Sequence, residues 1–301
     1  MMKTIRILCL ILSTFLISIQ TYAYSTITSA NSFRQVQQLI LASKHPHHLL
    51  LVLDDDDTLT MIPCPNQKSI AQCQYLGGPA WFSWQMTLSP NDPQRVGNFS
   101  RLLKIDALIL NMSKMPLDDP SIPAALAAAH QVGAHIVVAS ARGYSMLGAT
   151  ETQLQQDGIL NTIEKNALKT PSGHISFPGY YFPKILSDKK MRRIAYIDGV
   201  LYLSGQNKGV MLKLFLQKMH QTNNITQVIF VDDTFQNDKD MAAAYANNPK
   251  VKVTSIHFTR LSAHKAALTQ GKNAKKFQLA ATTQWNNLKR SMKNNLLGPN
   301  Y

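Results

Sequence analysis

Acidic residues are scarce in this sequence. Its 301 residues include 17 Asp and Glu against 31 Lys and Arg, so the formal net charge is +14. This excess of positive charge favours anionic partners, whether phosphate esters, nucleic acid or an anionic membrane surface. It does not choose among these classes, but it makes the positions of the few acids informative.

Other absences narrow the class of protein. Charged residues make up only 16% of the chain and hydrophobic residues 45%, which excludes disorder over most of its length. Neither G-x-G-x-x-G nor G-x-x-x-x-G-K-[ST] occurs, so nothing in the sequence indicates a dinucleotide-binding or P-loop site. The length suits one large α/β domain or two modest ones.

The N-terminus is predicted to be a secretory signal peptide over residues 1–23. Lys3 and Arg6 precede an apolar run over residues 7–19, and Ala23 ends a small-residue cleavage pattern. The run is short for a membrane span, so we expect cleavage rather than an uncleaved anchor, and no later segment is long enough to span a bilayer. The mature chain, residues 24–301, is therefore expected to be exported, either to the periplasm or out of the cell.

Cysteine is also rare, and export decides how it is interpreted. The mature chain keeps only Cys64 and Cys73. A close pair in an exported protein predicts a disulfide, with two free thiols as the alternative. A zinc site is disfavoured, because two cysteines without histidines at ligand spacing cannot fill four positions.

Short apolar strands alternate with helices along the mature chain. Strands are predicted at 48–53, 134–139, 227–231 and 250–257, and a β-hairpin at 194–204. Helices are predicted at 29–43, 120–132, 144–157, 208–220 and 271–295. This alternation predicts an α/β three-layer sandwich with a mainly parallel, Rossmann-like sheet. Residues 60–118 break the pattern with many prolines and glycines and are predicted to be an irregular insertion after the first strand.

Two of these strands end in carboxylates. Asp54–Asp57 follow the strand at 48–53, and Asp232 and Asp233 follow the strand at 227–231, with Asp238 and Asp240 beyond them. Eight of the 17 acids therefore lie at two strand ends. Adjacent carboxylates repel one another unless a cation neutralises them, and hard ions such as Mg²⁺ bind carboxylate oxygens. The active sites of parallel sheets lie at this edge.

Four motifs in order resemble the haloacid dehalogenase-like (HAD) superfamily. They are the D-x-D-x-T run Asp54–Thr58, Ser140 at a strand end, Lys208 at a helix start, and the acidic pair Asp232-Asp233 at another strand end. The stretch 76–85, Ser140-Ala141-Arg142 and Asn207-Lys208-Gly209 further resemble an uncharacterised exported family of this superfamily found in bacterial pathogens. A looser resemblance to secreted bacterial acid phosphatases breaks down at Phe235 and Asn237, in the fourth motif.

The resemblance implies a phosphatase. Asp54 is then the nucleophile that forms an aspartyl-phosphate, and Asp56 is the general acid and base. Mg²⁺ is held by the Asp54 carboxylate, the Asp56 carbonyl and Asp233, with Asp232 and Asp238 as further candidates. Lys208 offsets negative charge, and Ser140 donates a hydrogen bond to a phosphoryl oxygen.

The resemblance also implies that residues 61–118 form a cap that sets substrate choice. Trp81 and Trp84 are predicted to line a substrate pocket, with packing of the cap as an equal alternative. Arg142 is predicted to bind a second anionic group of the substrate, or else to pair with an aspartate.

The C-terminal tail, residues 271–301, is basic. From residue 241 onward there are ten Lys and Arg and no acid. A solvated basic face is favoured, binding to a membrane surface is the functional alternative, and nucleic acid is disfavoured because no aromatic residues interleave with the charges.

The sequence therefore predicts an exported, Mg²⁺-dependent phosphatase acting on a small phosphorylated substrate. A phosphotransferase would use the same residues. The alternative from another class is a non-catalytic secreted binding or host-interaction protein on a HAD-like scaffold. That alternative predicts broken motifs, and the presence of all four favours the enzyme.

Overall fold

A computed structural model of the chain describes residues 25–65, 73–174, 176–182 and 191–296. The predicted signal peptide lies outside the described residues, so it stays a prediction. Within the described residues, no helix is both long and apolar enough to cross a bilayer.

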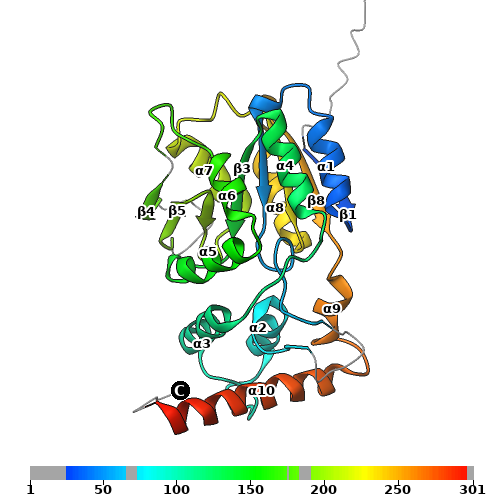
Figure 1. Cartoon of the computed structure of the whole chain (residues 1–301), viewed down its shortest axis with the longest axis vertical. Coiled ribbons are helices and arrows are strands. Elements are labelled where there is room, and N and C mark those ends of the chain that lie inside the picture. The colour runs from blue at the N-terminus through cyan, green and yellow to red at the C-terminus, as the bar shows by residue number, and fades with distance from the viewer. Residues whose placement is uncertain (1–24, 66–72, 175, 183–190, 297–301) are drawn as a thin grey trace, which may run out of the picture.

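An eight-stranded sheet forms the centre of the molecule (Figure 1). Its spatial order is β1-β8-β7-β2-β3-β6-β5-β4, and the first six strands in that order run parallel. β5 pairs antiparallel with β6 and β4 with β5, which confirms the predicted hairpin. The strands are β1 Ser25–Ala30, β2 Leu49–Leu53, β3 His135–Ser140, β4 Phe177–Tyr180, β5 Ile194–Ile197, β6 Val200–Tyr202, β7 Gln227–Asp232 and β8 Lys252–Phe258.

Helices cover both faces of the sheet, so the central strands are buried on both sides. β2 shows this directly, because Leu49, Leu51 and Leu53 belong to one hydrophobic cluster and Leu50 and Val52 to the other. The first cluster packs against α1, α4, α5 and α6, and the second against α7 and α8. The helices of these two layers are α1 Phe33–Leu41, α4 Ile122–Val132, α5 Leu147–Gln156, α6 Leu160–Lys165, α7 Lys208–Lys218 and α8 Phe235–Tyr245, with short 3₁₀ turns at Pro46–His48 and Tyr144–Met146. The predicted α/β three-layer sandwich is confirmed.

Four elements of this sandwich are not predicted from the sequence, namely β1, β4, α6 and α8. The helix expected at 29–43 begins only at Phe33, because residues 25–30 form the edge strand β1, paired with β8. β1 is mostly exposed and carries Ser and Thr in place of an apolar run. Helix α8 follows β7 directly and starts within the acidic motif, so its polar first turn conceals it.

The insertion after β2 is not irregular, which corrects the prediction for residues 60–118. It contains two helices, α2 Gly78–Thr87 and α3 Phe99–Met112. Its two ends meet, because the Met61 amide donates to the Pro116 carbonyl at 2.9 Å and the Asp118 amide to the Leu59 carbonyl at 3.0 Å. The insertion therefore leaves and re-enters the sandwich at one point, beside the carboxyl end of β2.

The C-terminal tail packs onto this insertion and is not a separate solvated element. α9 Ser262–Ala267 and α10 Ala274–Asn295 lie with α2 and α3 beyond one end of the sheet (Figure 1). One side of α10 supplies Ala281, Trp285 and Met292 to a third hydrophobic cluster. We call α2, α3, α9 and α10 the cap layer. The other face of α10 carries exposed basic side chains, including Lys275, Lys276, Arg290 and Lys293.

Trp285 provides a test of this packing. Its indole is 5% exposed, so Trp285→Ala should destabilise the cap layer by about 3–5 kcal/mol, the usual cost of truncating a buried aromatic residue. The neighbouring exposed Asn286→Ala should change the free energy of unfolding by less than about 0.5 kcal/mol. Chemical unfolding checks both values. Equal effects of the two substitutions would show that α10 is not packed against α2 and α3.

Candidate active site at the carboxyl edge of the sheet

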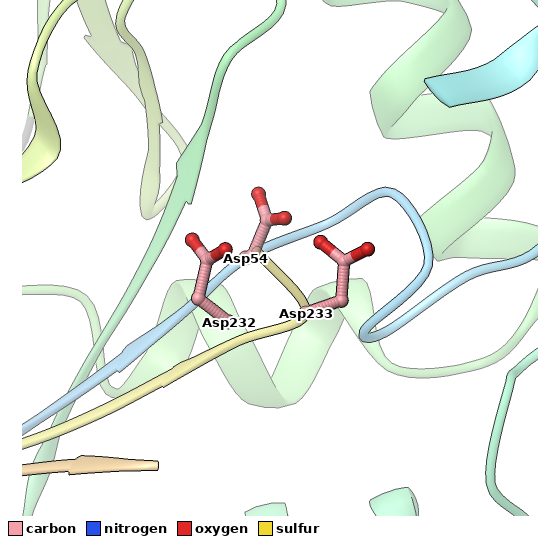
Figure 2. Close-up of side chains that lie close together, drawn as sticks. All are labelled: Asp54, Asp232 and Asp233. Atoms are coloured by element: carbon pink, nitrogen blue, oxygen red, sulfur yellow. The ribbon is translucent and has the colours of Figure 1, made fainter. Parts of the chain in front are cut away.

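Three carboxylates meet where β2 and β7 end (Figure 2). Ligand oxygens of Asp54, Asp232 and Asp233 all lie within 4.8 Å of one another. The two strands are neighbours in register, with Leu53 beside Val231, and the Asp54 amide donates to the Val231 carbonyl at 2.9 Å. The sheet therefore forces these acidic residues together. The cause is the parallel pairing of β2, which Asp54 follows directly, with β7, which ends in Asp232.

Lys208 neutralises part of this cluster. Its ammonium group is 2% exposed and donates to Asp54 and, at 2.7 Å, to Asp232. Burial opposes the charged form of Lys208, but the attraction of Asp232 and Asp54 outweighs it and raises the pKa. Burial raises the pKa of Asp54 well above its usual range, with Lys208 acting against the shift.

The Asn207-Lys208-Gly209 motif places this lysine at the first residue of α7. The Asn207 side chain accepts from the Val210 amide at 2.9 Å and caps the helix. A Cβ at Gly209 would come within 2.4 Å of the Asp240 carbonyl oxygen in α8, so glycine is needed for α7 and α8 to approach. The motif thus combines a helix cap, a charge and a close contact.

Asp232 is fully buried and its hydrogen bonds are satisfied. Its carboxylate accepts from the Thr234 amide at 2.8 Å and from the Asn237 side chain at 2.9 and 3.0 Å, as well as from Lys208. Asn237 therefore fixes Asp232 from the first turn of α8. With these donors in place, Asp232 serves to position Lys208, and Asp54 and Asp233 are left as the better ligands.

Asp233 is paired with a residue that sequence reasoning missed. Lys265, on α9 of the cap layer, donates to the Asp233 carboxylate and, at 3.0 Å, to the Thr234 hydroxyl. Nothing in the sequence distinguishes Lys265 from the other basic residues that follow residue 241. Its role depends on the return of α9 to the sheet edge, which only the tertiary structure shows.

The loop after β2 is held in a tight turn. The Asp55 carbonyl accepts from three successive amides, those of Thr58, Leu59 and Thr60. Asp57 lies in the left-handed region with φ 60°, and its buried carboxyl group has a raised pKa, caused first by burial and then by Asp233. A non-glycine residue in this conformation is strained, and such strain is typical of functional loops.

Arg142 does not face an open substrate pocket, which corrects the prediction that it binds substrate. It is 4% exposed, and its guanidinium donates to both oxygens of Asp56, at 2.9 and 2.7 Å. It also lies 3.2 Å from Asp55. The alternative, pairing with an aspartate, is the arrangement found. The bidentate contact engages both carboxylate oxygens of Asp56.

Ser140 ends β3 at the same edge. Val138 pairs with Leu53, which places Ser140 level with the start of the acidic loop. Its buried hydroxyl accepts from the Arg142 amide at 3.2 Å. Ser140 therefore helps to set the turn that carries Arg142.

Asp238 is not among the three carboxylates that converge in the described part of the chain, which corrects its prediction as a metal ligand. Its carboxylate accepts from the Ser255 hydroxyl at 2.8 Å and faces His257 at 3.3 Å, both on β8. Burial raises the pKa of Asp238 to about 7. Its contacts join α8 to the sheet.

Trp81 and Trp84 pack inside the cap layer, which corrects their prediction as substrate-binding residues. They are 1% and 3% exposed and belong to the cluster formed with α3 and α10. Trp81 borders a small cavity of about 20 Å³, shared with Asp57, Tyr75 and His264. That volume holds one water molecule at most. The sequence is equally compatible with packing of the cap and with a substrate pocket, and the burial of both side chains favours packing.

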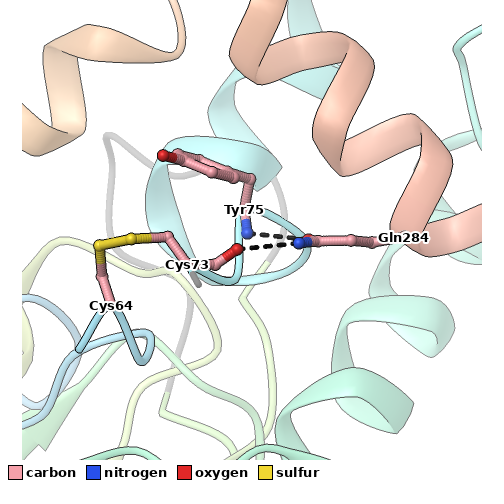
Figure 3. Close-up of a disulfide and its surroundings, with 4 residues drawn as sticks. All are labelled: Cys64, Cys73, Tyr75 and Gln284. Carbon is pink, nitrogen blue, oxygen red and sulfur yellow. Dashed lines mark hydrogen bonds between the residues drawn. A yellow bond between two sulfur atoms is a disulfide. The ribbon is translucent and has the colours of Figure 1, made fainter. Parts of the chain in front are cut away.

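A disulfide joins Cys64 and Cys73 beside the site, as the sequence predicts (Figure 3). The side chain of Gln284 on α10 holds the chain just beyond it, donating to the Cys73 carbonyl at 2.9 Å and accepting from the Tyr75 amide at 2.9 Å. It also accepts from the Leu76 amide at 3.1 Å. One α10 side chain and one covalent bond thus fix the entry to α2.

The site fits a hard divalent cation. Its possible ligands are carboxylate oxygens, the type that Mg²⁺ prefers, and three of them already converge. Mutual repulsion adds to the raised pKa of Asp54, since Asp232 and Asp233 both act in that direction. A cation of higher charge than lysine would relieve this repulsion.

Comparison with known proteins gives one match. A family model described as "Protein of unknown function (DUF2608)" matches residues 29–298, which is nearly the whole chain. Searches of curated proteins and of solved structures give no match.

Removal of Arg142 should be costly. Arg142→Met leaves the buried Asp55 and the partly buried Asp56 side by side without their guanidinium, and we expect a loss of about 3–5 kcal/mol in the free energy of unfolding. Arg101→Met, at an exposed position of α3, serves as the control and should cost less than about 0.5 kcal/mol. Urea unfolding of both variants measures the difference, and a small loss for Arg142→Met would mean that the pair is not buried.

Asp106 predicts a pH dependence of stability. This carboxyl group on α3 is 8% exposed, and burial, together with the charge of Asp56, raises its pKa to about 7. The folded state thus holds a proton that the unfolded chain releases above about pH 4, so this group lowers stability as pH rises to about 7. Asp106→Asn should gain up to about 1.4 kcal/mol per pH unit over the wild type in that window. A gain independent of pH, measured by unfolding from pH 4 to 8, would contradict this.

Proposed function

We propose that this chain, which belongs to the DUF2608 family, is a Mg²⁺-dependent phosphatase of HAD-like type that hydrolyses a small phosphomonoester through an aspartyl-phosphate at Asp54. One observation carries the proposal. Asp54 lies at the carboxyl edge of a parallel sheet, in contact with buried Lys208 and within 4.8 Å of Asp232 and Asp233. A carboxylate nucleophile needs this combination of nearby positive charge and metal ligands.

Asp54 and Asp233 are the residues that would hold the cation. Asp232 already accepts from Lys208, Asn237 and the Thr234 amide, so it acts mainly on the lysine. When bound, Mg²⁺ would screen the negative charge of the phosphoryl group from the carboxylates around it.

The reaction has two steps. A carboxylate oxygen of Asp54 attacks phosphorus, the bond from phosphorus to the ester oxygen breaks, and the leaving oxygen takes up a proton. Water then attacks the phosphorus of the aspartyl-phosphate, its bond to Asp54 breaks, and inorganic phosphate is released. Lys208 contributes its charge to Asp54 in both steps, because it is held on the second side by Asp232.

Asp56 is proposed to move the protons. It is 16% exposed at its side chain, whereas Asp55 beside it is buried and tied to Thr60 and Arg142. Both carboxylate oxygens of Asp56 accept from Arg142, and in the second step Asp56 would accept a proton from the attacking water. Protonating the leaving oxygen in the first step requires Asp56 to take up a proton and turn from Arg142 toward the substrate.

Export and the HAD-like relationship support this function as expectations from the sequence. The rival hypothesis, a non-catalytic secreted binding protein, predicts loss of one or more of the reacting groups. The presence of Lys208 beside Asp54, and of Arg142 beside Asp56, argues against it, because the residues of the motifs are retained.

The proposal is tested by assay of residues 24–301 against a panel of phosphomonoesters. With Mg²⁺ present we expect hydrolysis that EDTA abolishes and that Asp54→Asn lowers by at least ~1,000-fold, because the nucleophile is lost. Asp240→Asn, a carboxylate outside the three-carboxylate cluster, should retain activity. Hydrolysis that persists in EDTA or in Asp54→Asn, or none across the panel, would contradict the proposal.

A further inference from the structure

Lys265 is the contact through which the C-terminal segment reaches the site. It lies on the short helix α9, and its ammonium group donates to Asp233 and to the Thr234 hydroxyl. Asp57 and Asp54 are the next negative charges acting on it. No motif of the sequence points to this residue, and the proposed reaction does not use it.

The two lysines of the site differ in one respect. Lys208 is 2% exposed and enclosed between Asp54 and Asp232, so it cannot leave without exposing a buried cluster. The Lys265 side chain is 27% exposed, at the boundary between the sheet and the cap layer. Its flexible stem can withdraw toward water at small cost, because an ammonium group is strongly hydrated.

We propose that Lys265 and a divalent cation compete for the Asp233 carboxylate, so that Lys265 sets the metal affinity of the site and metal binding loosens α9. The inference rests on the metal site of the proposed function and adds a regulating residue to it. A divalent cation and the Lys265 ammonium group beside one carboxylate repel each other. Lys265 is the lysine that gives way, because it is more exposed than Lys208.

The contacts of α9 show where the effect travels. His264, beside Lys265, stacks on Tyr75, and Tyr75 stacks on Phe277 of α10. The Tyr75 amide also donates a hydrogen bond to the Gln284 side chain of α10. Release of Lys265 would therefore loosen α9 against the same residues that hold the entry to α2. By linkage, the factor by which metal binding weakens the docking of α9 equals the factor by which docked α9 weakens metal binding.

Calorimetric titration of Mg²⁺ into substrate-free protein tests the affinity directly. Lys265→Met keeps the stem and removes the charge, and we expect it to bind Mg²⁺ about 5- to 100-fold more tightly than the wild type. Lys272→Met, in the exposed segment between α9 and α10, is the matched control and should bind as the wild type does. Equal or weaker binding by Lys265→Met would overturn the inference.

Amide hydrogen exchange of the wild-type protein tests the loosening without any variant. Saturating Mg²⁺ should speed exchange over residues 262–268, while α7 exchange stays unchanged or slows. Unchanged exchange at α9 in the metal-bound protein would overturn the inference. Failure of the wild type and of Lys265→Met to bind Mg²⁺ at all would instead overturn the metal site of the proposed function.

Discussion

The ammonium group of Lys208 is buried between Asp54 and Asp232, two carboxylates that arrive on neighbouring strands. Parallel pairing of β2 with β7 brings these acids together, and like charges in a buried place repel strongly. The arrangement is therefore stable only with cations beside it. Asn207 and Gly209 set the position of one such cation, and the cap layer supplies a second through Lys265. A third, Arg142, holds the next two aspartates of the acidic loop.

The cap layer joins parts of the chain that are distant in sequence. The insertion after β2 leaves and returns through backbone hydrogen bonds next to the acidic loop, and α10 covers it with Trp285. Gln284 and the Cys64–Cys73 disulfide fix the segment leading into α2. The basic C-terminal segment thus has a structural role on its inner side. It also delivers Lys265 to a carboxylate of the site.

The sequence predicts the sandwich and the convergence of Asp54 with Asp232 and Asp233, because strand ends in a parallel sheet must meet. It fails where a residue has two chemically reasonable partners. Arg142 suits a substrate anion or an aspartate equally well, and only its burial against Asp55 and Asp56 in the folded chain decides. Trp81 and Trp84 are ambiguous in the same way. Lys265 and β1 are missed for another reason, since neither carries a local pattern and both owe their places to distant partners.

The proposed reaction depends on a covalent bond between Asp54 and phosphorus. The most direct measurement is a single-turnover reaction of the Mg²⁺-loaded protein with a phosphomonoester that it hydrolyses. The reaction is quenched with acid at successive times, and the peptides are analysed by mass spectrometry. We expect a phosphoryl group on Asp54 that appears before inorganic phosphate and then declines. Release of phosphate at full stoichiometry with no phosphoryl group on Asp54 at any time, or with one on another residue, would contradict it.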